Sequence, residues 1–242
     1  MSKVNNHQLI RKRISSDLIS LSSILRDRSG GVFRNPEVLT SAANEVERFG
    51  RDNEWCYEVP DLIFSVAVPQ GVLPRDCGSG LDVKFNLSLK GSCLPSGDDD
   101  ELIDLILDLE ISSPEKGYIC AWHFDRHIGQ EGDNKTEAHP LYHFQHGGKA
   151  LAGLDDIFGM SLMLPAPRLP FPPMDAILAI DFVLSNFSGD AWNRLRNDTA
   201  YLRLLRSAQL RFWKPYMVRL ATWWTPGPKS DGWVDQIFPH LA

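Results

Sequence analysis

The chain has 242 residues, a mass of 27.3 kDa, 43% hydrophobic residues and 23% charged residues. This composition is typical of a globular protein and excludes a disordered chain or a coiled coil. No apolar run reaches the roughly 18 residues that a membrane-spanning helix needs, so we expect no membrane partner. The basic N-terminus has no apolar stretch behind it, which argues against a secretory signal and favours a cytoplasmic protein.

The net charge of −6 is unevenly distributed. Residues 1–28 carry six basic and two acidic side chains, and residues 191–219 carry seven basic and one acidic. Residues 52–110 between them carry thirteen acidic and three basic side chains. The middle of the chain would repel phosphate, so we expect contact with nucleic acid, if it occurs, only through the basic ends.

The first two predicted elements are helices. Apolar residues recur at spacings of three and four over 6–28 and again over 38–49. Gly30 ends the first helix, whereas Asn35 and Pro36 suit the N-cap and first position of the second.

The four cysteines contain no C-x-x-C pair, which predicts free thiols in or near the core rather than a zinc ribbon.

From residue 61 the apolar period changes from 3.6 to 2. The alternation predicts half-buried antiparallel strands over 61–69, 81–90, 102–111, 117–128 and 141–146. Lysines of the second strand should pair with acidic residues of the third. A proline-rich crossing follows over 165–173, and helices begin near Met174 and Asp190. Asp198 or Thr199 could cap a second piece of the last helix, and Pro215 would kink or end it.

This order predicts one α+β domain over residues 1–242. Its parts are a helical region (1–51), an antiparallel β-meander of about five or six strands with a His-rich hairpin (52–164), and the proline crossing with basic aromatic helices (165–242).

Five of the seven histidines lie in the predicted hairpin: His123, His127, His139, His143 and His146. If Trp122 and Phe124 face the core, then His123, Asp125, His127 and His143 lie together on the opposite, open face. His139 precedes a proline and is expected in a loop.

Three interpretations of the hairpin remain open. The first is a divalent metal site (Zn, Mn or Fe) formed by His123, Asp125 and His143. His127 cannot share an ion with His123 on a regular strand, because strand positions four apart lie about 13 Å apart. The second is acid–base catalysis by His123, Asp125, His127 and His143, with Gln145 and His146 as supporting residues. The third is a polar sheet face whose histidines are structural.

The basic C-terminal segment interleaves arginines with aromatic residues between 192 and 224. Such a segment is a helix with an aromatic core face, a protein interface or a surface for single-stranded nucleic acid. The residues that we single out for binding are Arg206, Trp213 and Tyr216 in this segment, together with Gln145 and His146 of the hairpin.

The passage from Gly147 and Gly148 through Phe158 and 160–164 to Leu169, Pro170 and Pro173 resembles the strand-then-YPxxP passage of the ubiquitin-conjugating-enzyme and RWD folds. Leu169 stands in the tyrosine position, and the resemblance covers residues 61–188. The family's catalytic cysteine follows the meander, but this chain has no cysteine after Cys120, and His139-Pro140-Leu141 comes too early for the family's His-Pro-Asn motif. The resemblance therefore implies a non-catalytic binding variant.

The functional expectation is a cytoplasmic recognition or assembly module with a protein partner. It would act through the His-rich hairpin face and the basic aromatic C-terminal helix. The alternative is a metal-dependent or His-based hydrolase of the phosphodiesterase or nuclease type, which would use the same hairpin.

Overall fold

The computed structural model describes residues 6–49, 53–94, 101–126, 140–147, 151 and 168–222. The helices are α1 (Asn6–Arg28), α2 (Val38–Arg48), α3 (Ala176–Phe187), α4 (Gly189–Arg196), α5 (Thr199–Ala208), a π-helix (Gln209–Trp213) and α6 (Lys214–Thr222). The strands are β1 (Glu54–Ala67), β2 (Gly80–Ser92), β3 (Leu102–Ser112), β4 (Ile119–Arg126), β5 (Tyr142–His146) and β6 (Leu169–Pro170).

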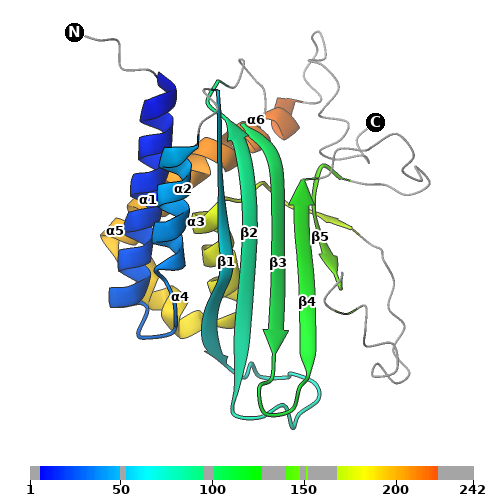
Figure 1. The fold of residues 1–242 in the computed structure, drawn as a ribbon. Coiled ribbons are helices and arrows are strands. Elements are labelled where there is room, and N and C mark those ends of the chain that lie inside the picture. Colours follow the sequence, from blue (N-terminus) through cyan, green and yellow to red (C-terminus); the bar gives the residue numbers. More distant parts are fainter. Residues whose placement is uncertain are drawn as a thin grey trace.

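The strands form one antiparallel sheet in the order β1-β2-β3-β4-β5-β6, so the α+β prediction is confirmed. The helices lie behind the sheet in Figure 1, with α1 and α2 also beside strand β1. The core lies between these layers and contains the predicted apolar face of every long strand. None of the helices in the described ranges combines the length and apolar character that crossing a bilayer requires.

Strand β1 begins seven residues before the predicted start at residue 61, because Pro60 does not end it. Instead the register shifts between Val59 and Leu62, and Asp61 adopts a φ of 48°. Proline is tolerated at an edge strand or a bulge, where its missing N–H breaks no ladder bond. The apolar alternation therefore continues from Trp55 across the bulge.

The outer edge of β1 is protected by the helical layer. The backbone of 32–34 pairs with it through Ser65 N–H to Val32 O (3.1 Å) and Arg34 N–H to Ile63 O (2.9 Å). Further along, the Glu45 carboxylate accepts from the Glu58 N–H at 3.0 Å. These contacts satisfy donors that would otherwise invite another strand to pair.

Asn35 belongs to the same edge, and its predicted function as an N-cap is wrong. Its amide donates to Asp61 O at 2.7 Å and accepts from Ile63 N–H at 2.8 Å. Because the side chain is committed to β1, helix α2 begins at Val38 with no side-chain cap.

The predicted pairing of lysines with the third strand also needs correction. Lys84 and Lys90 lie opposite Glu110 and Asp104 of β3 in the register. Both side chains nevertheless extend toward β1 on the other side of β2. Lys84 Nζ lies 2.8 Å from Asp61 Oδ1, and Lys90 Nζ lies 3.1 Å from Glu54 Oε2. The lysines therefore neutralise β1 and leave β3 acidic.

Gly91 of β2 allows the ring of Trp55 to lie flat against the sheet. A Cβ at Gly91 would lie 2.2 Å from the nearest Trp55 ring carbon, and Trp55 is only 1% exposed. We expect Gly91→Ala to lower the free energy of unfolding by about 1–3 kcal/mol, because the buried ring must shift. Urea denaturation measures this loss.

Gly80→Ala is the matched control in the same strand, since its Cβ would meet only Val66 O at an ordinary 3.6 Å. We expect a change within about 0.5 kcal/mol for this variant. Equal losses in the two variants would show that the Trp55 contact does not limit the side chain at position 91.

The C-terminal helices confirm one expected cap and refine the effect of Pro215. Asp198 caps α5 by accepting from Ala200 N–H (2.8 Å) and Tyr201 N–H (3.0 Å). Pro215 does not end the helix. The turn before it widens into the π-helix, in which Lys214 N–H bonds to Gln209 O, five residues back. A wider turn separates the proline ring from the preceding carbonyls, which an α-helical turn would bring into contact with it.

Candidate functional site

The predicted hairpin is present, and its register decides which side chains meet. His123 pairs with Gln145 and Asp125 with His143 between β4 and β5, while Asp108 of β3 pairs with His123. Successive strand residues point to opposite faces, so these five side chains share the face opposite Trp122 and Phe124. We call this side of the sheet, which no described helix covers, the open face.

His123 lies between two carboxylates. Its Nδ1 is 2.6 Å from Asp108 Oδ1, and its Nε2 is 3.2 Å from Asp125 Oδ2. The hydrogen bonds to Asp108 and Asp125 raise the pKa of His123 to about 9, against the opposing effect of partial burial. At neutral pH the ring is therefore an imidazolium that donates from both nitrogens.

Asp108 is the residue of this group that sequence reasoning did not select. The alternation over 102–111 places it on the polar side of β3, but only the β3–β4 register brings it beside His123. The strongest contact of His123 thus comes from the strand outside the hairpin.

His143 shares the open face by register but is not open to solvent. It is 1% exposed, and its Nδ1 lies 3.0 Å from Pro140 O and 3.2 Å from Asp125 Oδ1. A carbonyl oxygen can only accept, so Nδ1 carries the proton. The expectation of a solvent-facing His143 is therefore wrong: β5 lies between β4 and β6 in the sheet, and the side chain is buried there.

His146 does not support the other histidines, as we had expected. It pairs with Trp122 on the helix side of the sheet, with ring centroids 5.1 Å apart, and its Nε2 lies 3.7 Å from Cys120 Sγ. Burial raises the pKa of the Cys120 thiol, so this thiol is not an activated nucleophile. His127 and His139 lie outside the described residues.

The geometry restricts the chemistry of this cluster. Within the described segments, no group of three or more His, Cys, Asp and Glu side chains is placed to hold a metal ion. A metal ligand or general base needs a ring nitrogen with a free lone pair, and both nitrogens of His123 are protonated. The arrangement is instead that of a fixed charge network across three strands.

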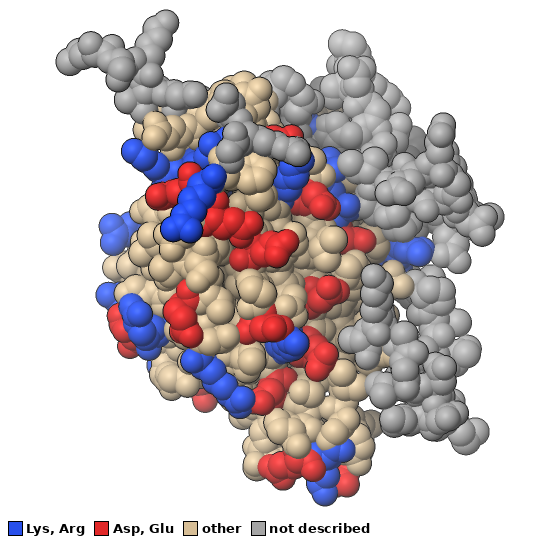
Figure 2. Space-filling view, in the orientation of Figure 1, with Lys and Arg blue, Asp and Glu red and all other residues tan. Residues whose placement is uncertain are grey.

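Acidic side chains dominate the open face beyond His123. Figure 2 shows them gathered over the strands, with few basic groups between them. The register places the following acidic residues on the open face or, for Asp61, at the bulge beside it: Glu54, Glu58, Asp61, Asp82, Asp104, Asp108, Glu110 and Asp125. Lys84, Lys90 and Arg34 pair with Asp61, Glu54 and Asp82, and the remaining carboxylates give this face a negative field.

The C-terminal binding residues are separated by the structure. Arg206 is exposed on α5. Tyr216 is 5% exposed and packs edge-on against Tyr142. Trp213 is half-buried, and its Nε1 donates to Pro173 O at 3.0 Å. Trp213 and Tyr216 thus hold the helix on the core, and of the three residues only Arg206 is exposed.

Comparisons with protein-family models, with curated proteins and with solved structures found no match for this chain.

Proposed function

We propose that the protein is a recognition module whose open face binds a basic segment of a partner protein. The observation that carries this proposal is the state of His123, held as an imidazolium between Asp108 and Asp125. Such a ring stabilises the sheet and orients two carboxylates, but it has no free lone pair with which to act as a general base or a metal ligand. Recognition therefore accounts for this face better than the hydrolase alternative.

Charge supports the chemistry of the partner. The open face is acidic over β1 to β4 (Figure 2), and a basic segment would be steered to it by complementary potential. The middle of the chain would repel nucleic acid for the same reason. Exposed Arg206 on α5 belongs to a separate basic surface, which we keep as a second contact for an assembly partner.

Two further points are in keeping with this proposal. The thiols of Cys56, Cys77, Cys93 and Cys120 are free, as expected in the reducing cytoplasm. The resemblance to the ubiquitin-conjugating-enzyme and RWD folds also belongs to the proposal, because without a cysteine after Cys120 it implies binding rather than transthiolation.

Binding of an octalysine peptide tests the open face. The variant Asp104→Asn/Glu110→Gln removes two charges of β3 without touching the His123 contacts. We expect it to weaken octalysine binding about fivefold, because each exposed charge contributes about 0.5 kcal/mol. Added salt should weaken binding by the unaltered protein. Fluorescence anisotropy at low ionic strength measures both effects.

The matched control is Glu37→Gln/Asp190→Asn, which removes two exposed charges from the helical layer. It should change the affinity less than twofold. Equal weakening by the two double variants, or no binding at low salt, would contradict recognition through the open face.

A further inference from the structure

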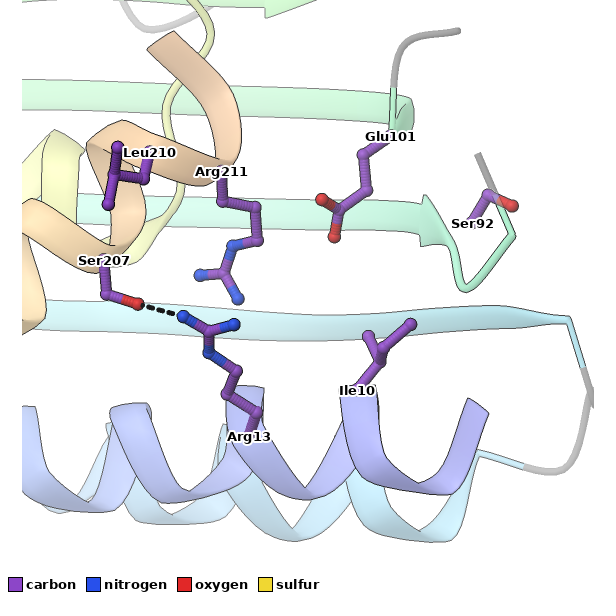
Figure 3. A pocket seen from close by; sticks show the side chains of 7 residues that line it. All are labelled: Ile10, Arg13, Ser92, Glu101, Ser207, Leu210 and Arg211. Atoms are coloured by element: carbon purple, nitrogen blue, oxygen red, sulfur yellow. Dashed lines mark hydrogen bonds between the residues drawn. The ribbon is translucent and has the colours of Figure 1, made fainter. Parts of the chain in front are cut away.

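A second feature lies on the helical side, between α1, the β2–β3 end of the sheet and the π-helix. The cavity there has a volume of about 440 Å³ and is lined in part by Arg13, Ser92, Glu101, Ser207 and Arg211. Figure 3 shows the guanidinium groups of Arg13 and Arg211 turned toward one another, with the Glu101 carboxylate to one side. This volume is in the range of small-molecule sites.

Arg13 contributes an exposed guanidinium with spare donors. It donates to the Ser207 hydroxyl at 2.8 Å and forms no ion pair with any carboxylate in the described ranges. A guanidinium has five N–H donors in a fixed planar fork. Most of the donor capacity of Arg13 is therefore available to a ligand in the cavity.

Arg211 contributes a second, largely buried guanidinium. Its side chain is 13% exposed, and Nη2 donates to Asp175 Oδ2 at 2.8 Å. Its Nε is buried and has no hydrogen-bond partner among the residues that the structure describes. A buried donor without an acceptor is costly, so it favours a ligand or solvent oxygen nearby.

The backbone that carries Arg211 is itself unusual. Arg211 lies in the π-helix, where the Lys214 N–H bonds to Gln209 O. Single π-turns inside helices occur frequently at functional sites, since they present side chains that a regular helix would turn away. Here the turn directs the Arg211 side chain toward α1, where it meets Arg13 (Figure 3).

We propose that this cavity binds a small molecule through one carboxylate or phosphate group held between Arg13 and Arg211. Arginine forks match the oxygens of both groups. The carboxylates of Asp17, Glu101 and Asp175 beside the arginines disfavour negative charge on the rest of the ligand and favour a hydrogen-bond donor there. This site is independent of the open face.

Thermal unfolding with increasing acetate or inorganic phosphate tests this site, with sodium chloride at equal ionic strength as the blank. A ligand that binds only the folded state raises the Tm in a saturable manner. We expect such a rise with at least one of the two anions. A rise with acetate alone assigns a carboxylate ligand, and a rise with phosphate alone assigns a phosphate ester.

The variant Arg13→Gln locates the effect and should still fold, because Arg13 is exposed. We expect it to weaken the anion response about tenfold, as for a lost charge-assisted contact. Lys12→Gln removes the same charge one residue away, outside the cavity lining, and should leave the response unchanged. No rise beyond the blank with either anion, or an equal rise in Arg13→Gln, would overturn the proposal.

Discussion

Raising the pH from about 6 to about 10 is expected to remove about 3 kcal/mol of folding stability through His123 alone. Folding raises the pKa of this imidazole from 6.5 to about 9, and each unit is worth about 1.4 kcal/mol. A raised pKa means that proton binding stabilises the folded state. The contribution is complete below pH 6.5, declines as the pH increases, and is lost above the folded pKa near 9.

Urea denaturation at a series of pH values measures this dependence, and His123→Gln isolates it from other titrating groups. The difference in unfolding free energy between the unaltered protein and the variant should shrink steadily from pH 6 to pH 10. A difference that stays constant over this range would show that the proton on His123 is not held by Asp108 and Asp125.

The second large effect is expected at Asp181, a buried carboxylate in α3. It accepts from Arg196 at 3.0 and 2.7 Å, from Trp192 Nε1 at 3.2 Å and from the Tyr201 hydroxyl at 3.2 Å. Removing the Asp181 carboxylate leaves the Arg196 guanidinium and the fully buried Tyr201 hydroxyl without their acceptor. We expect Asp181→Ala to lower the free energy of unfolding by about 3–5 kcal/mol.

Asp190→Ala is the control for this prediction, because Asp190 is an exposed acid in the first turn of α4. Its loss should cost less than about 1 kcal/mol, the scale of a helix-dipole interaction. Chemical denaturation of the two variants decides the point. A cost at Asp181 no greater than that at Asp190 would mean that the network does not join α3 to α4 and α5.

The periodic parts of the fold could be predicted from the sequence. Strands β2 and β3 and helix α1 have one apolar face each, so their burial follows directly from residue spacing. Asp198 could be predicted as a helix cap because its side chain accepts hydrogen bonds only from the first turn of α5, which follows it directly in the sequence. The predicted strand starts at residue 61 and misses 54–60, because the bulge between Val59 and Leu62 interrupts the strict alternation of apolar residues.

The candidate site was predictable in part. Alternation placed His123, Asp125 and His143 on one face, and the same alternation should have placed His146 on the other. Contacts between side chains of different strands could not be predicted from the alternation within one strand. The pairing of Asp108 with His123, the direction of Lys84 and the burial of His143 depend on how strands and flanking segments meet in space.

The arginine cavity was beyond sequence reasoning for the same reason. Arg13 and Arg211 lie near opposite ends of the chain. Considered separately, each is one basic residue on a predicted helix and does not indicate a binding site. Pro215 indicated an irregular helix, but not that a π-turn would direct Arg211 toward α1.

The state of the His123 ring is the central claim, and an NMR titration of its nitrogens tests it most directly. We expect both ring nitrogens to be protonated at pH 7, with a pKa near 9 that falls on substitution Asp108→Asn. A His123 pKa at or below the ordinary 6.5 would leave a ring nitrogen free at neutral pH. That result would contradict the charge network and favour the catalytic and metal interpretations over recognition.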